Sequence, residues 1–178
     1  ITKKLDVTDK LSIGSYMGVP ILLSNGEVYG TFCCYKYYSD NTLNQRDLSF
    51  LRAISDIASD LIETNITSEK TYRDSVKRIQ STLEENKLNI YYQPIYNIQT
   101  SQIAGFESLS RFVSEPYRSP DIWFKEASEV GLGEFLEIAA IEKAIRGLNE
   151  FNDDTYISIN ISPEYILNGA ISKALENI

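Results

Sequence analysis

The segment LNIYYQPIYNIQTSQIAGFESLSRF, residues 88–112, decides the fold of this chain. It holds two runs dense in the branched and aromatic residues typical of β-strands, Leu88–Ile95 and Ile103–Phe112. The second run carries Glu107 in its middle and Arg111 near its end. A carboxylate inside a strand is costly unless it is paired, hydrogen-bonded or bound to a metal. Glu107 is therefore either part of a structural ion pair, for example with Arg111, or a ligand for a cation.

Several motifs in this half of the chain resemble the EAL family of bacterial cyclic di-GMP phosphodiesterases, named after a Glu-Ala-Leu signature that an Arg follows. Here the signature reads Glu107-Ser108-Leu109, and Arg111 follows it. The other motifs are, in order, Tyr91-Tyr92-Gln93-Pro94-Ile95, the stretch from Ser119-Pro120 to Ala127-Ser128-Glu129-Val130-Gly131-Leu132, and Tyr156-Ile157-Ser158-Ile159-Asn160-Ile161-Ser162-Pro163. The resemblance covers roughly residues 71–178 and rests on the order and spacing of these motifs.

The resemblance implies a role for four residues. Glu107 and Asn160 would be oxygen ligands of a divalent Mg or Mn ion, and hard cations prefer such donors. Gln93 and Arg111 would face the cyclic di-GMP, with the planar guanidinium of Arg111 offered to a phosphate. The residues alone leave other roles open, because Arg111 can neutralise Glu107 and Asn160 can cap a helix that Ser162-Pro163 opens. Both roles are compatible, since barrel enzymes place ligands where strands lead into helices.

The chain departs from the family pattern in three ways. Ser108 replaces the usual Ala, which removes no ligand, and Lys125-Glu126 stands where the family usually has Pro-Leu, which we expect to alter a surface rather than the site. The family's later strands carry further acidic ligands, a paired Asp motif and a Lys, and the sequence ends at Ile178 before them. We therefore expect a fragment of a larger protein, in keeping with its start at Ile1. A (β/α)₈ barrel takes about 250 residues, so we expect an incomplete, TIM-like barrel that is inactive alone.

The N-terminal third is organised differently. Two apolar runs flank Ser24-Asn25-Gly26, and Asn-Gly between such runs is the strongest short signal of a β-hairpin. A polar turn follows, and then Asn44 can cap a helix that has Asp47 in its first turn. This pattern, from Ser12 to about Glu63, resembles the C-terminal half of a GAF sensory domain. The resemblance implies an α+β domain with an unknown small-molecule ligand, and a structural or dimerising GAF domain without ligand is the alternative.

Residues 47–85 have a helical period and contain no Gly or Pro, which predicts one long helix or two helices broken near residues 64–67. An alternating three-four spacing joins Leu51, Ala58, Ile62, Tyr72, Val76, Ile79 and Leu83, with Ser55, Asn65 and Glu69 in the same register. Apolar ends with a polar centre predict a homodimer through a weakened coiled coil. The alternative is that each end packs on its own domain while the middle is solvated.

The composition of the chain limits its location, the metals it could bind and the partners it could have. No apolar run approaches the roughly 20 residues of a membrane span and no secretory signal is present, so we expect a cytoplasmic location. With no His and only the adjacent Cys33 and Cys34, a zinc site is disfavoured, and we expect both cysteines to be buried. The net charge of −8 argues against a nucleic-acid polymer as partner. A small anionic dinucleotide stays possible because metal ions offset like charges.

These observations predict three parts: a partial GAF-like α+β sensory domain over residues 1–63, a helical linker over residues 64–86, and the N-terminal part of an α/β EAL domain over residues 87–178. The implied function is Mg- or Mn-dependent hydrolysis of cyclic di-GMP to the linear dinucleotide, regulated by the GAF sensor. One alternative is a catalytically inert EAL module that binds cyclic di-GMP as a receptor. Another is a sensory and dimerisation module whose barrel part is a structural output arm.

Overall fold

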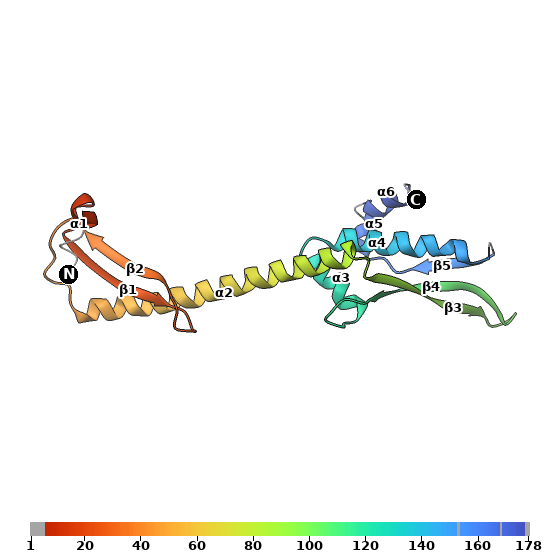
Figure 1. Ribbon diagram of the computed structural model, residues 1–178, viewed down its shortest axis with the longest axis horizontal. Helices are drawn as coiled ribbons and strands as arrows, with labels where there is room; N and C mark the ends of the chain where they lie inside the picture. The colour runs from red at the N-terminus through yellow and green to blue at the C-terminus, as the bar shows by residue number, and fades with distance from the viewer. Residues whose placement is uncertain (1–5, 153, 168, 177–178) are drawn as a thin grey trace. The chain divides into compact units, whose positions relative to one another are not determined.

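The computed structural model of the chain describes residues 6–152, 154–167 and 169–176 (Figure 1). The elements are, in order, α1 (Asp6–Lys10), β1 (Ser15–Leu22), β2 (Val28–Lys36), α2 (Gln45–Glu84), β3 (Leu88–Asn97), β4 (Gln102–Phe112), α3 (Pro120–Glu129), α4 (Gly133–Arg146), the 3-10 helix η2 (Gly147–Glu150), β5 (Tyr156–Ile159), α5 (Pro163–Leu167) and α6 (Ala170–Leu175). The chain divides into two compact units, Ile1–Lys70 and Thr71–Ile178, of mixed α and β structure. Among the described helices, none is long and apolar enough to cross a membrane.

The first unit is built on the predicted β-hairpin. β1 and β2 pair antiparallel around the Asn-Gly turn, in which Gly26 has a φ of +83°. This conformation costs glycine little because it has no Cβ. The first half of α2 lies along the hairpin (Figure 1), and the hydroxyl of Ser55 donates a hydrogen bond of 3.0 Å to the carbonyl oxygen of Pro20. The Ser59 hydroxyl donates to the carbonyl oxygen of Leu22 in the same way. Side chains of α2 therefore bind the backbone of β1.

The prediction that the two cysteines are buried is wrong. Cys33 and Cys34 are both exposed on β2. Cys33 lies opposite Gly18, which has no side chain to cover it. The serine contacts of α2 fall farther along β1, at Pro20 and Leu22, and so do not shield the cysteines.

The helix α2 runs without a break, which excludes the predicted alternative of two helices. The predicted cap at its start is confirmed: the Arg46 amide donates to Asn44 Oδ1 (2.8 Å), and the Asn44 amide donates to Asp47 Oδ2 (3.0 Å). Leu51 is buried in the first unit and Ile79 in the second, while residues 64–72 between them are exposed. Each end of α2 therefore packs within its own unit, as the alternative to the coiled coil predicts.

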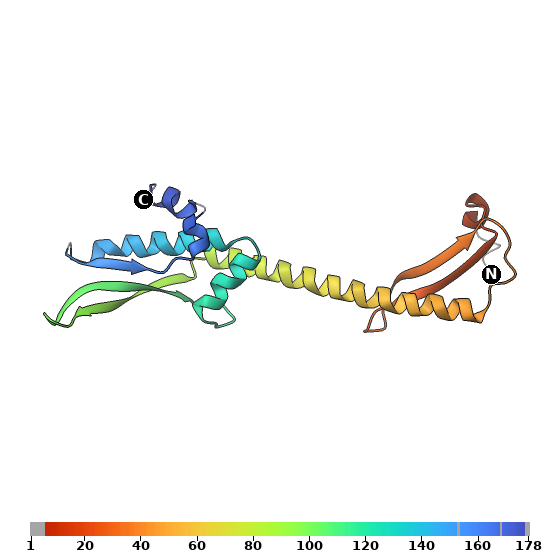
Figure 2. The same ribbon diagram turned by 180° about the vertical axis from the view of Figure 1, so that it is seen from behind.

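The second unit contains a three-stranded sheet in the order β3-β4-β5. β3 and β4 are antiparallel, and β4 and β5 are parallel and are joined through α3 and α4. In both views α4 runs along the sheet (Figure 2). The main core cluster comprises Ile79, Leu88, Phe112, Trp123, Ala127, Val130, Leu136 and Ala140. Because β4 and β5 are parallel, they run toward the same edge of the sheet. β5 ends at Ile159, beside Ser108 in the middle of β4, and the candidate site lies there.

Candidate functional site

The predicted metal ligands and one predicted nucleotide contact lie together on this sheet. Glu107 is on the central strand β4, and the strand register places Gln93 of β3 directly opposite it. Ser158 of β5 is its partner on the other side. Asn160 follows the end of β5, and its Nδ2 donates a hydrogen bond of 2.9 Å to Glu107 Oε1. The fold thus brings together side chains from three motifs that are far apart in the sequence.

Arg111 lies farther along β4 and does not pair with Glu107. Four residues of a strand span about 13 Å, which is too far for an ion pair between these two side chains. Arg111 Nη1 instead donates a hydrogen bond of 2.8 Å to the carbonyl oxygen of Ser110, and its side chain is exposed. None of the ion pairs in the described part of the chain includes Glu107. The possibility that Arg111 neutralises Glu107 is therefore wrong, because the carboxylate is held by the Asn160 amide.

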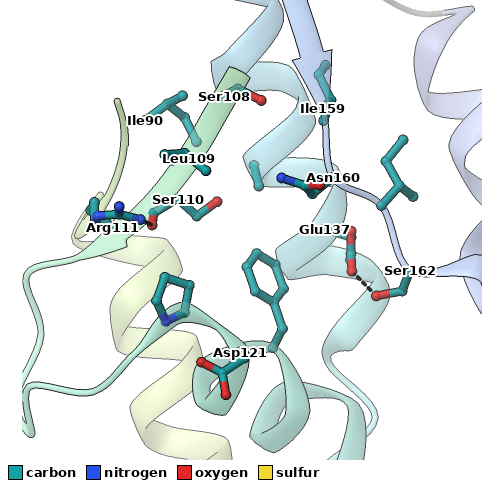
Figure 3. A pocket seen from close by; sticks show the side chains of 14 residues that line it. Ile90, Ser108, Leu109, Ser110, Arg111, Asp121, Glu137, Ile159, Asn160 and Ser162 are labelled. Carbon is teal, nitrogen blue, oxygen red and sulfur yellow. Dashed lines mark hydrogen bonds between the residues drawn. The ribbon is translucent and has the colours of Figure 1, made fainter. Parts of the chain in front are cut away.

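A pocket of about 370 Å³ opens beside this edge of the sheet (Figure 3). This volume lies in the lower part of the range for small-molecule sites, about 300–1,000 Å³. Its lining residues are Ile90, Ser108, Leu109, Ser110, Arg111, Pro120, Asp121, Phe124, Glu137, Ala140, Ile159, Asn160, Ile161 and Ser162. Asn160 therefore borders both the pocket and Glu107, so a ligand in the pocket would lie next to the predicted metal site.

The pocket has an uneven distribution of charge. Arg111 and Asp121 are exposed at its rim, whereas Glu137 of α4 is buried and accepts a hydrogen bond from the Ser162 hydroxyl (Figure 3). An anionic ligand in the pocket could therefore bind the exposed guanidinium of Arg111. Sequence reasoning missed Glu137, although a carboxylate within the apolar run Phe135–Ile141 was a signal that could have found it.

The residues present fit a divalent cation as a partial ligand set. Glu107 and Asn160 carry the carboxylate and amide oxygens that Mg and Mn prefer. Mg is often held by one or two carboxylates, with water and substrate phosphates completing its shell. Within the described residues no group of three or more His, Cys, Asp or Glu side chains could hold a metal. As ligands, both side chains would present oxygen, so the Asn160 amide would no longer donate to Glu107.

Comparison with known proteins identifies the family. The model of the EAL domain family matches residues 76–178, more than half of the chain. The chain belongs to the EAL family. The model of the GAF domain matches residues 3–62 of this EAL-family chain, so both predicted resemblances are confirmed.

The chain is also similar to two curated proteins and to a solved structure. The probable cyclic di-GMP phosphodiesterase PdeB of Escherichia coli is 26% identical over 106 residues, which are 57% of this chain and 20% of that protein. The uncharacterized protein sll1895 of Synechocystis is 27% identical over 164 residues, 82% of this chain and 23% of that protein. The chain thus spans less than a quarter of the length of these relatives. The structure of the PaMucR phosphodiesterase with c-di-GMP has a TM-score of 0.49 at 21% identity, covering 58% of this chain and 46% of that one.

Proposed function

We propose that this chain is part of a signalling protein that hydrolyses cyclic di-GMP to the linear dinucleotide. The observation that carries the proposal is the contact of 2.9 Å between Asn160, just after the end of β5, and Glu107 in the middle of the parallel strand β4. Membership of the EAL family and the likeness to a probable cyclic di-GMP phosphodiesterase support it. Glu107 and Asn160 would hold Mg or Mn, and Gln93 and Arg111 would bind the dinucleotide.

Each side chain has a role that follows from its surroundings. The metal, when bound, would supply an activated water and offset negative charge on the phosphoryl oxygens. Arg111 uses Nη1 for the Ser110 carbonyl, which steadies its exposed guanidinium and leaves further N–H donors for a phosphate. Gln93 is exposed opposite Glu107 and can offer its amide to the same ligand. Asn160 links the two functions, because it contacts Glu107 and lines the pocket.

We propose the same three-part organisation as the sequence predicts, with a GAF-like domain over residues 1–63, a helical linker over residues 64–86 and the first part of an EAL barrel over residues 87–178. The matches of the GAF and EAL models to residues 3–62 and 76–178 support this division. The parallel pair β4 and β5, joined through helices, is the kind of unit from which a (β/α)₈ barrel is built. Two metal ligands are too few for this chemistry, so we expect the stretch alone to be inactive.

The direct test is Mg-dependent hydrolysis of cyclic di-GMP by the full-length protein and its Glu107→Ala variant. Glu129→Ala, which removes an exposed carboxylate of α3 outside the pocket, is the matched control. We expect turnover in the wild type and the control and none in Glu107→Ala. Tight binding without turnover in the wild type would make the protein a receptor. Neither binding nor turnover would favour a structural output arm.

We also propose a cytoplasmic homodimer joined through α2. Both cysteines are free, as is common for cytosolic proteins. Because Leu51 is buried within its own unit, we assign the dimer contact to Phe50, Ile57 and Leu61, which are 69%, 62% and 67% exposed and follow a helical spacing. Leu61→Glu should shift the sedimentation profile toward the monomer, and Arg52→Glu, an exposed site on another side of α2, should not. Identical profiles for the two variants would disprove this contact.

A further inference from the structure

Glu126 of α3 is the centre of a cluster of paired charges. Its Oε1 accepts a hydrogen bond of 2.6 Å from the Ser75 hydroxyl and another from the guanidinium of Arg78, both on α2. Its Oε2 is paired with Arg118, in the loop before α3. The Glu126 side chain is only 12% exposed. The expectation that Lys125-Glu126 merely alters a surface is therefore wrong for Glu126.

The surroundings of Glu126 favour its charged form. Burial raises the pKa of the Glu126 carboxyl. The hydrogen bonds from Ser75 and Arg118 and the positive charges of Arg78 and Arg118 lower this pKa by more than burial raises it. The net effect is a pKa below the usual value. A carboxylate with two guanidinium partners and a hydroxyl donor is thus a stable link between α2 and α3.

The same end of α2 is attached to the segments on either side of α3. The hydroxyls of Thr82 on α2 and Ser114 lie 2.9 Å apart, and both side chains are buried. Ser114 comes two residues after the end of β4. The Tyr72 hydroxyl donates to the carbonyl oxygen of Val130, just after α3, at 3.5 Å. These contacts join α2 to the whole segment that carries α3.

Arg118 connects the cluster to the pocket. Its guanidinium lies 4.3 Å from the centre of the Trp123 ring, and Trp123 stacks on Phe112 at the end of β4. Pro120 and Phe124, on the same turns of α3, line the pocket. Arg118 Nε and Trp123 Nε1 are buried and have no hydrogen-bond partner among the described residues. The charge of Arg118 therefore depends on the carboxylate at the centre of the cluster for compensation.

We propose that Glu126 is a positioning residue that couples the C-terminal end of α2 to the nucleotide pocket. This inference rests on the proposed function, because it takes the ligand of the pocket to be cyclic di-GMP. A rotation of α2 would separate Ser75 and Arg78 from Glu126 and leave Arg118 as its remaining charged partner. The helix α3, which carries Pro120 and Phe124 of the pocket wall, would then no longer be held to α2 by this cluster. Since coupling between two sites is reciprocal, a ligand in the pocket would also strengthen the attachment of α2.

The first test is amide hydrogen exchange in the 178-residue chain without nucleotide. Arg78→Met removes a partner of Glu126 on α2 without touching the pocket. Lys77→Met is the control for an exposed neighbour, and Ile79→Val is the control for a loss of stability, since Ile79 is in the core but not in the charge cluster. We expect exchange over residues 113–124 to be several-fold faster in Arg78→Met than in either control. Equal exchange in the three variants would overturn the proposal.

The second test measures the affinity of the same variants, made in the full-length protein, for cyclic di-GMP with Mg²⁺. We expect Arg78→Met to bind several-fold more weakly than Lys77→Met, and Arg78→Lys, which keeps the charge, to recover most of the loss. Equal affinities in a wild type that binds would overturn the coupling. If the wild type does not bind, the proposed function fails, and the exchange comparison alone decides whether α2 controls the pocket wall.

Discussion

The two units hold their parts of α2 by different means. In the first unit, Ser55 and Ser59 donate hydrogen bonds to the backbone of β1, and Leu51 is the large apolar residue that α2 buries there. In the second unit, α2 contributes Ile79 to a core that contains Trp123. Ser75 and Arg78 of α2 add the charged link to Glu126, so one end of the helix is attached mainly by polar contacts and the other by a packed core as well.

The attachment of α2 to the second unit is expected to be stronger than its attachment to the first unit. Hydrogen bonds contribute about 1 kcal/mol net, whereas a fully buried apolar side chain contributes about 1.5–3 kcal/mol. A two-stranded hairpin is also marginal in water unless it packs on another element. We therefore expect the first unit to depend closely on its few contacts with α2, and the second unit to tolerate the loss of any one polar contact.

The largest effect is expected for Trp123→Ala in the second unit. Trp123 is fully buried and stacks on Phe112, so its loss should cost about 3–4 kcal/mol, toward the low end of the usual range because an unpaired buried N–H is also removed. Denaturant unfolding followed by far-ultraviolet circular dichroism would measure it. Phe135→Ala, at an exposed position of α4, is the control. If the two variants unfold alike, the second unit does not depend on this core.

A smaller effect is expected for Leu51→Ala in the first unit. Leu51 is buried one helical turn before Ser55, which bonds to β1, so we expect a loss of about 2 kcal/mol, at the low end of the range for this change. Hydrogen exchange of β1 and β2 amides would localise the effect to this unit. Ile66→Ala removes an apolar side chain of the same size at an exposed position of α2 and should leave this exchange unchanged. Equal exchange in both variants would show that Leu51 does not hold the hairpin.

Local signals in the sequence predicted most of the secondary structure. The Asn-Gly turn predicted the hairpin, Asn44 and Asp47 predicted the start of α2, and Ser162-Pro163 predicted the start of α5. Each of these signals acts within a few residues, where backbone geometry and capping hydrogen bonds decide the conformation. Such features require no knowledge of which distant segment packs nearby.

The wrong predictions concern contacts between distant residues. Periodicity shows which residues share a face but not what covers that face. Sequence patterns thus place Leu51 in a dimer contact, the cysteines in a core and Glu126 on a surface, although a remote segment decides the surroundings of each. The proximity of Glu107 and Asn160, 53 residues apart, followed from the family resemblance and not from local physics.

Acid should weaken the charged link of the second unit selectively. Because the folded pKa of Glu126 is lowered, its contribution to stability is complete above the unfolded value, about 4.3, and is lost as the pH falls through the folded pKa. The stability difference between the wild type and Glu126→Gln should therefore be present at pH 7 and shrink below about pH 4. Denaturant unfolding at a series of pH values would measure it. A difference that does not change with pH would mean that the charge of Glu126 does not stabilise the fold.

The smallest effect is expected for Ser55→Ala, which tests the polar attachment of the first unit. The Ser55 side chain is buried, and its loss leaves the Pro20 carbonyl without this donor, at a cost of about 1 kcal/mol. Ser49→Ala is the matched control, because the Ser49 hydroxyl donates its hydrogen bond to the Gln45 carbonyl within α2 itself. Hydrogen exchange of β1 amides should be faster in Ser55→Ala than in Ser49→Ala. If both variants exchange alike, apolar burial also dominates in the first unit, and the two units would then differ in the amount of buried surface and not in the kind of contact.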